Sequence, residues 1–170
     1  MAKINILNKI YLAGPLILLY YLSISEVDTN LENFLDIFSI NLQIIIIYFW
    51  MIKRPGLMGT GHIFVAGLIN DVVMGFPLGI SSLSYLVVCF VGNYVRNKSV
   101  NTTLASDWVT FLIALLLSNL LFFSLISNFS DLVIPFSKIG YNTFFTFFLF
   151  PIFWFLFNIY QMSFVGSQDA

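Results

Sequence analysis

The chain has 170 residues, of which 59% are hydrophobic and only 9% are charged, with a mean hydropathy of +0.95 and a formal net charge of −1. Because soluble domains carry roughly 25% charged residues, this composition excludes an ordinary soluble protein and predicts one transmembrane domain over residues 1–170. The apolar runs are too long for barrel strands, so we expect an all-α polytopic membrane protein. The small net charge predicts no nucleic-acid partner, and a single cysteine, Cys89, excludes a disulfide framework.

Six apolar segments follow one another along the chain and predict six membrane-spanning helices. Their approximate ranges are 10–24, 38–52, 57–73, 78–94, 108–129 and 141–164. The first segment also resembles a signal peptide, because Lys3 and Lys9 precede it and Ser23-Ile-Ser25 forms a small-x-small site. The last segment contains Pro151, which predicts a break or a kink in that helix.

The distribution of basic residues supports the count of six spans through the positive-inside rule. With a cytoplasmic N-terminus, six of the seven Lys and Arg residues fall on the cytoplasmic side, and only Lys138 lies outside. These six are Lys3, Lys9, Lys53, Arg54, Arg96 and Lys98. An acidic loop without any cation, from Glu26 to Asp36, then falls outside. The sequence therefore predicts a multi-pass protein with both termini in the cytoplasm.

The third segment carries a carboxylate, Asp71, inside its apolar run. An intramembrane charge costs roughly 2.5–3.5 kcal/mol, so a compensating contact is expected. At ~1.5 Å per residue, Asp71 lies about 21 Å from the inner face of a core of about 30 Å, in its outer third. Gly67 and Gly75 lie one helical turn to either side on the same face, where they would let another helix approach closely. Pro77 and Gly79 then end the helix and turn the chain.

Several roles for Asp71 are compatible with the sequence. It could contact a partner helix or a solute, lie at the interface in contact with water, or form an internal tie within the bundle. A specific form of the internal tie is available, because the next helix begins just after Gly79 with unpaired N–H groups that favour a carboxylate. We predict that Asp71 caps the start of the fourth span.

Other candidate chemistry is sparse. His62 lies nine residues before Asp71, about 13.5 Å along a straight helix, so the two cannot form an acid–base pair within that helix. The hydroxyl groups of Ser81, Ser82 and Ser84 could act as nucleophiles, but no general base lies at a sequence spacing that would place it beside them. Serine near a helix start is more often a cap. The sequence has no metal-ligand cluster, phosphate-binding loop or serine-hydrolase elbow. We therefore predict a protein that is not an enzyme, with no catalytic, cofactor-binding or metal-binding residues.

The sixth segment is unusual for its aromatic residues, which cover every side of the helix. They are Phe144, Phe145, Phe147, Phe148, Phe150, Phe153, Trp154, Phe155 and Phe157. This distribution is typical of contact with lipid. The alternative is a docking surface for the transmembrane helix of another protein, because aromatic anchors dominate contact energetics.

Five short motifs occur together between Tyr48 and Tyr94. They are Tyr48-Phe-Trp50, Lys53-Arg-Pro55, Gly67-Leu-Ile-Asn-Asp71, Gly75-Phe-Pro77-Leu-Gly79 and Ser82-Leu83. This part of the chain resembles the rod shape-determining protein MreD family. In that family a short second span ends in an aromatic pair and a basic-proline turn, and a helix with a Gly-x-x-x-Asp core follows. Where the family often has an Arg-Pro pair entering the second span, this chain reads Phe38-Ser-Ile-Asn41.

The resemblance implies a scaffold without catalytic activity in the bacterial cytoplasmic (inner) membrane. Its partners would be membrane lipid, an MreC-like bitopic membrane protein, an MreB-like cytoskeleton and the peptidoglycan synthesis enzymes of the elongation (rod) complex, which maintains cell shape. It further implies a six-helix transmembrane bundle similar to the substrate-binding subunits of energy-coupling-factor transporters. That similarity supplies the alternative function, a small-solute-binding subunit of a transporter, which requires a pocket with several convergent polar groups. The candidate structural or interaction residues are Gly67, Asp71, Gly75, Pro77 and Gly79.

Overall fold

The computed structural model describes residues 6–25, 41–98, 103–130 and 136–165, and all regular structure within these ranges is helical. The elements are α1 (Ile6–Ile24), α2 (Leu42–Lys53), α3 (Pro55–Met58), α4 (Thr60–Met74), α5 (Ile80–Lys98), α6 (Leu104–Phe129), α7 (Phe136–Tyr160) and a final turn of π-helix, η1 (Gln161–Val165). The prediction of an all-α protein is therefore confirmed for the described part of the chain.

Each predicted segment contains a helix, but several helices begin or end at other residues than the predicted segments. The second helix starts at Leu42, because the side chain of Asn41 caps it by accepting a hydrogen bond from the N–H of Ile44 at 3.1 Å. Residues 38–40 of that predicted segment lie outside the described residues. The third segment is divided into α3 and α4 at Gly59, which adopts a φ of +59° that favours glycine.

The last two predicted segments also begin too late. Helix α6 starts at Leu104, four residues before the predicted start, because the Thr103 side chain accepts a hydrogen bond from the N–H of Ser106 at 3.4 Å. Helix α7 starts at Phe136 and continues through Pro151 to Tyr160, so of the predicted break or kink at the proline the break does not occur. The kink stays a prediction.

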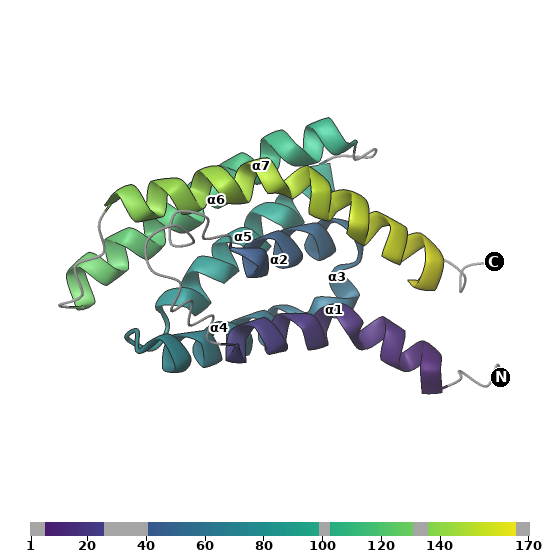
Figure 1. Ribbon diagram of the computed structural model, residues 1–170, viewed down its shortest axis with the longest axis horizontal. Helices are drawn as coiled ribbons and strands as arrows, with labels where there is room; N and C mark the ends of the chain where they lie inside the picture. The colour runs from purple at the N-terminus through teal and green to yellow at the C-terminus, as the bar shows by residue number, and fades with distance from the viewer. Residues whose placement is uncertain (1–5, 26–40, 99–102, 131–135, 166–170) are drawn as a thin grey trace, which may run out of the picture.

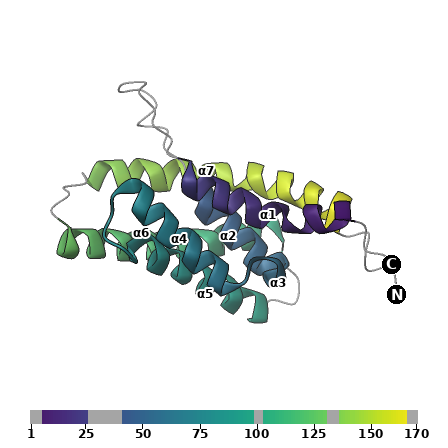
Figure 2. The same cartoon turned by 90° about the horizontal axis from the view of Figure 1, so that it is seen from below.

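The helices form three layers (Figure 1). Helices α6 and α7 make one outer layer, α2 and α5 lie in the middle, and α1 and α4 make the other outer layer, where Figure 2 shows them side by side. The middle layer holds most of the core, since every residue of α2 from Ile44 to Ile52 is buried. The segment that carries the resemblance, from Tyr48 to Tyr94, thus provides α3, α4, the second half of α2 and α5 as far as Tyr94.

Two helices among the described residues are long and apolar enough to span a membrane, Leu104–Phe129 and Phe136–Ser163. At ~1.5 Å per residue, α6 is about 39 Å long, whereas α2 is only about 18 Å and α4 about 22 Å, against a hydrocarbon core of about 30 Å. The structure therefore supports two candidate membrane-spanning helices. The count of six spans and the transporter-like bundle stay predictions.

Helix α7 does not present a uniform aromatic surface. Among its described side chains only Thr146 and Phe150 are fully buried, and Phe150 stacks on Phe111 of α6 with ring centroids 4.1 Å apart. Phe148 and Phe155 point outward, with 52% and 61% of their surface exposed. One side of α7 therefore belongs to the core, and the other side is available to lipid or to a partner.

Candidate functional site

The Asp71 carboxylate lies at the junction between α4 and α5 and is completely buried. Its Oδ2 accepts a hydrogen bond from the N–H of Gly79 at 2.7 Å, and its Oδ1 accepts one from the N–H of Ser81 at 2.8 Å. Gly79 immediately precedes α5, and Ser81 is the second residue of that helix. These N–H groups would otherwise be unpaired at the helix start. The prediction that Asp71 caps this helix is confirmed.

The two glycines flanking Asp71 have different roles. A Cβ at position 67 would overlap the Cα of Ser82 and lie 2.7 Å from its backbone nitrogen, so Gly67 allows α4 and α5 to touch, as predicted. Gly75 does not lie at a helix contact, because a Cβ there would meet nothing within 4 Å. That part of the prediction was wrong. Gly75 ends α4 in a left-handed conformation with a φ of +67°, which L side chains rarely adopt.

The turn after Gly75 positions the capped end of α5. Gly79 has a φ of +103°, again a conformation suited to glycine, and its carbonyl accepts the N–H of Leu83 at 2.9 Å. Pro77 lies within the turn, and its carbonyl accepts the N–H of Ile80 at 3.4 Å. Pro77 and Gly79 thus turn the chain as predicted, and the turn aims the N–H groups of α5 back at Asp71.

A buried polar network extends from this junction to α2. The Asn70 amide donates to Ser81 Oγ at 3.1 Å, and its carbonyl oxygen accepts a hydrogen bond from the Gln43 side chain at 3.0 Å. Tyr85 in turn donates its hydroxyl proton to Gln43 Oε1. Sequence reasoning missed Gln43 and Tyr85, although a lone amide in the apolar run of α2 was a usable signal.

The remaining candidate side chains bond within the fold. Ser82 donates to the carbonyl of Phe64 at 3.0 Å. This hydrogen bond joins α5 to α4 beside their close contact at Gly67. Ser84 donates to the carbonyl of Ile80 one turn earlier at 2.9 Å. His62 is exposed on α4, and its Nδ1 lies 3.1 Å from the hydroxyl of Tyr20 in α1. Neither the serines nor the histidine therefore shows a nucleophile–base contact among the described residues.

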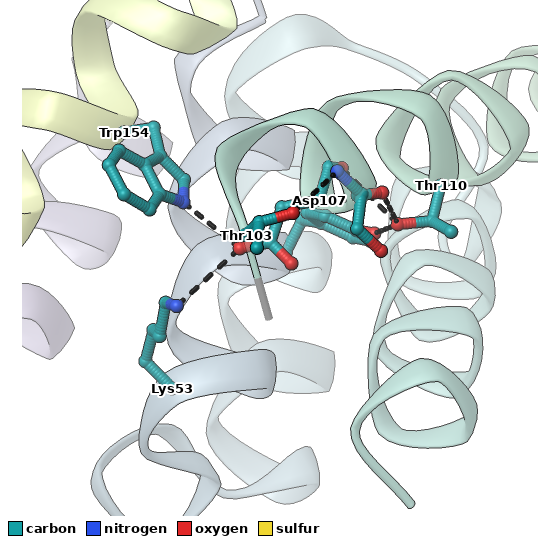
Figure 3. A network of polar contacts seen from close by, with 7 residues as sticks. Lys53, Thr103, Asp107, Thr110 and Trp154 are labelled. Atoms are coloured by element: carbon teal, nitrogen blue, oxygen red, sulfur yellow. Dashed lines mark hydrogen bonds and ion pairs between the residues drawn. The ribbon is translucent and has the colours of Figure 1, made fainter. Parts of the chain in front are cut away.

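A second buried carboxylate, Asp107, lies in the first turn of α6 and is only 1% exposed. Figure 3 shows Trp154 and Lys53 approaching it from α7 and α2. The Trp154 indole donates to Asp107 Oδ2 at 3.0 Å, and the Lys53 ammonium lies 3.5 Å from the same oxygen. The other oxygen, Oδ1, is buried without a hydrogen-bond partner among the described residues. One carboxylate therefore ties three helices together.

Three further contacts lie around Asp107. The Lys53 ammonium lies 5.4 Å from the centroid of the Trp154 ring, a cation–π distance. On the other side of Asp107, the Thr110 hydroxyl donates to the carbonyl of Ser106 at 2.7 Å and lies 2.5 Å from the hydroxyl of Tyr48 in α2. Asp107 lies between the predicted spans 78–94 and 108–129, and the sequence did not single it out, because its partners come from distant parts of the chain.

The chemistry of both carboxylates is that of hydrogen-bond acceptors. Asp71 uses both oxygens on backbone N–H groups, and Asp107 binds an indole and an ammonium. Within the described ranges, no three His, Cys, Asp or Glu residues come together in a group that could hold a metal ion. Both carboxylates therefore fix the positions of neighbouring helices relative to one another.

The chain matches no protein-family model, no curated protein and no solved structure. The MreD-like motifs and the similarity to transporter subunits therefore stay predictions from sequence.

Proposed function

We propose that this chain is a non-enzymatic scaffold of the MreD type in the cytoplasmic membrane of a bacterium. It would support lateral peptidoglycan synthesis and cell shape as part of the elongation complex, beside an MreC-like bitopic protein. One observation carries this proposal: Asp71, the acid of the Gly-x-x-x-Asp motif, is fully engaged in joining α4 to α5. Because both of its carboxylate oxygens accept hydrogen bonds within the fold, Asp71 holds α4 and α5 together and has no oxygen available to react with a substrate.

The distribution of charge and apolar surface supports a placement in the membrane. Large hydrophobic side chains point outward from most helices, including Phe90 and Leu120 with 72% and 71% of their surface exposed. Such a surface in water would be an aggregation liability. Lys53 and Arg96, at the ends of α2 and α5, line one hollow and so lie at the same end of the bundle. This arrangement fits six spans with that end in the cytoplasm.

The alternative, a solute-binding subunit of a transporter, needs polar groups that converge on a pocket. The polar side chains between α2, α4 and α5 instead bind one another: Gln43 binds Asn70, and Asn70 binds Ser81. Their hydrogen-bonding capacity is thereby used within the fold. This observation favours the scaffold.

The proposal is tested by site-specific photo-crosslinking in the cells that make the protein. A photo-reactive residue replaces exposed Phe148 or Phe155 on α7, or exposed Val72 on α4, and the buried position Phe150 serves as the control. We expect adducts with a bitopic shape protein or a wall-synthesis enzyme from at least one exposed position and none from position 150. An ATPase-linked transport module among the adducts would favour the transporter instead. Lipid adducts alone would contradict a partner surface on these faces.

A further inference from the structure

A hollow of about 280 Å³ opens where α2 turns into α3. Its lining residues are Lys53, Arg54, Pro55, Gly56, Leu57 and Arg96. This volume is close to the lower end of the range of about 300–1,000 Å³ for ligand sites. Three of the six lining residues are cations. Lys53 ends α2 and Arg54 follows it, whereas Arg96 lies in the last turn of α5, more than forty residues later in the sequence.

The charge of this hollow, which we call the basic hollow, is strongly positive. None of its lining residues is acidic. The described part of the chain contains two carboxylates, of which Asp71 caps the opposite end of α5 and Asp107 contacts Lys53 at 3.5 Å. The chemistry that fits is an anion with several oxygen atoms.

The basic hollow combines a fixed cation with a more accessible one. Lys53 is held in place by the Asp107 carboxylate and the Trp154 ring, and its side chain is only 15% exposed. Arg96 lies in the last turn of α5 and is exposed. A guanidinium presents a planar fork of donors that matches a phosphate, whereas an ammonium acts as a point charge. Together these groups are suited to a phosphate.

The surroundings of the basic hollow are those of a membrane surface. Buried Ile52 immediately precedes Lys53, so the apolar part of α2 ends at the hollow. Near Arg96, the half-exposed ring of Tyr94 lies 5.6 Å from the Lys98 ammonium. Tyrosine and lysine at a helix end are typical of the interfacial region, where basic pockets between helices bind lipid headgroups on the cytoplasmic side.

We propose that the basic hollow binds the phosphate of an anionic phospholipid from the cytoplasmic leaflet. The guanidinium groups of Arg54 and Arg96 donate hydrogen bonds to the phosphate oxygens, and Lys53 supplies a fixed positive charge. This inference rests on the membrane placement in the proposed function but not on its protein partners. The crosslinking experiment can therefore fail while the basic hollow binds lipid, and lipid binding can fail while crosslinking identifies a protein partner.

The test uses the full chain purified in a neutral detergent, with thermal unfolding followed by tryptophan fluorescence. Phosphatidylglycerol, phosphatidylcholine and inorganic phosphate are titrated separately. We expect phosphatidylglycerol alone to raise the unfolding temperature. The variant Arg96→Gln should weaken this response about fivefold in lipid concentration, as the loss of one basic contact at a membrane surface predicts. Lys98→Gln is the matched control, because Lys98 lies two residues away at the same end of α5 but does not line the hollow.

Each other outcome overturns the proposal. Equal weakening by Arg96→Gln and Lys98→Gln would mean general surface attraction, and an equal response to phosphatidylcholine would remove the role of headgroup charge. If inorganic phosphate alone stabilised the protein, and Arg96→Gln abolished that effect, the basic hollow would bind a free anion and not a lipid. If Arg96→Gln unfolds too early for the thermal assay, native mass spectrometry counts the phosphatidylglycerol molecules retained. Retention equal to that of the unchanged protein would also overturn the assignment.

Discussion

The Asp71 side chain accepts hydrogen bonds at the start of α5, a helix that begins nine residues later. The carboxylate gives its two oxygens to the N–H groups of Gly79 and Ser81, which have no partner within α5. A turn held by Gly75 and Gly79 in positive-φ conformations brings these groups back to Asp71. The local spacing of acid, glycine and proline was therefore enough to predict this contact.

Substitution of Asp71 should separate hydrogen bonding from charge. We expect Asp71→Asn to lower the yield of folded protein modestly, because an amide oxygen still accepts one of the two N–H groups. Asp71→Leu leaves both groups buried and unpaired, at a cost of about 1–3 kcal/mol each, and should lower the yield severely. The yield is measured by fluorescence-detected gel filtration of a tagged protein. Full yield from both variants would refute the capping role.

Gly67 should tolerate no side chain, because α5 lies directly against it. We expect Gly67→Ala to lower the free energy of unfolding by about 1–3 kcal/mol, the usual cost of overpacking. Gly61→Ala is the matched control, since Gly61 is in the same helix and a Cβ there meets nothing within 4 Å. Unfolding temperatures of the two variants in detergent provide the comparison. A Gly67→Ala protein as stable as Gly61→Ala would show that α4 and α5 can separate without cost.

At the scale of helices, Asp107 is the point where α2, α6 and α7 are joined. Lys53 and Trp154 meet at one carboxylate oxygen, and Phe150 stacks on Phe111 in the same pair of helices, α6 and α7. These contacts hold the inner face of α7, whose outer face is exposed. Further contacts follow the same side of α7, since the Trp108 indole donates to the carbonyl of Phe147 and the Asn119 amide donates to the hydroxyl of Thr143.

Removal of Asp107 should leave the mostly buried Lys53 ammonium without its carboxylate. We expect Asp107→Leu to cost roughly 3–5 kcal/mol in the free energy of unfolding, as for other broken buried ion pairs. The double variant Lys53→Met/Asp107→Leu should lose less than the sum of the two single variants, because it removes both charges. A double-mutant cycle by denaturant unfolding in detergent measures this coupling. The control cycle pairs Asp107→Leu with Lys98→Met and should be additive; equal coupling in both cycles would rule out a specific ion pair.

For the whole molecule, the three-layer arrangement leaves the outward faces apolar and uses its polar side chains inside. The network from Gln43 through Asn70 to Ser81 links the middle layer to α4. An apolar exterior, with polar side chains that bind one another inside, fits the proposed lipid-embedded scaffold, since hydrocarbon offers no hydrogen bonds.

A panel of vitamins and metal ions should leave the unfolding temperature of the purified protein unchanged. A solute that binds the folded state at 100 times its dissociation constant would add about 2.7 kcal/mol to the free energy of unfolding. Such a shift is easily measured by tryptophan fluorescence. One specific, saturable shift would favour the transport subunit over the scaffold.

The helical class, the approximate helix positions and the contact of Asp71 with the start of α5 could be predicted from the sequence. These features depend on composition and on spacings of a few residues, because helices satisfy their own backbone and a helix start needs a nearby acceptor. The division at Gly59 was missed, although Gly59-Thr-Gly61 interrupts the apolar residues at this point. Only the tertiary structure brought Lys53 and Trp154 to Asp107, and Arg96 to the basic hollow. Those contacts arise from how whole helices pack, which no local spacing encodes.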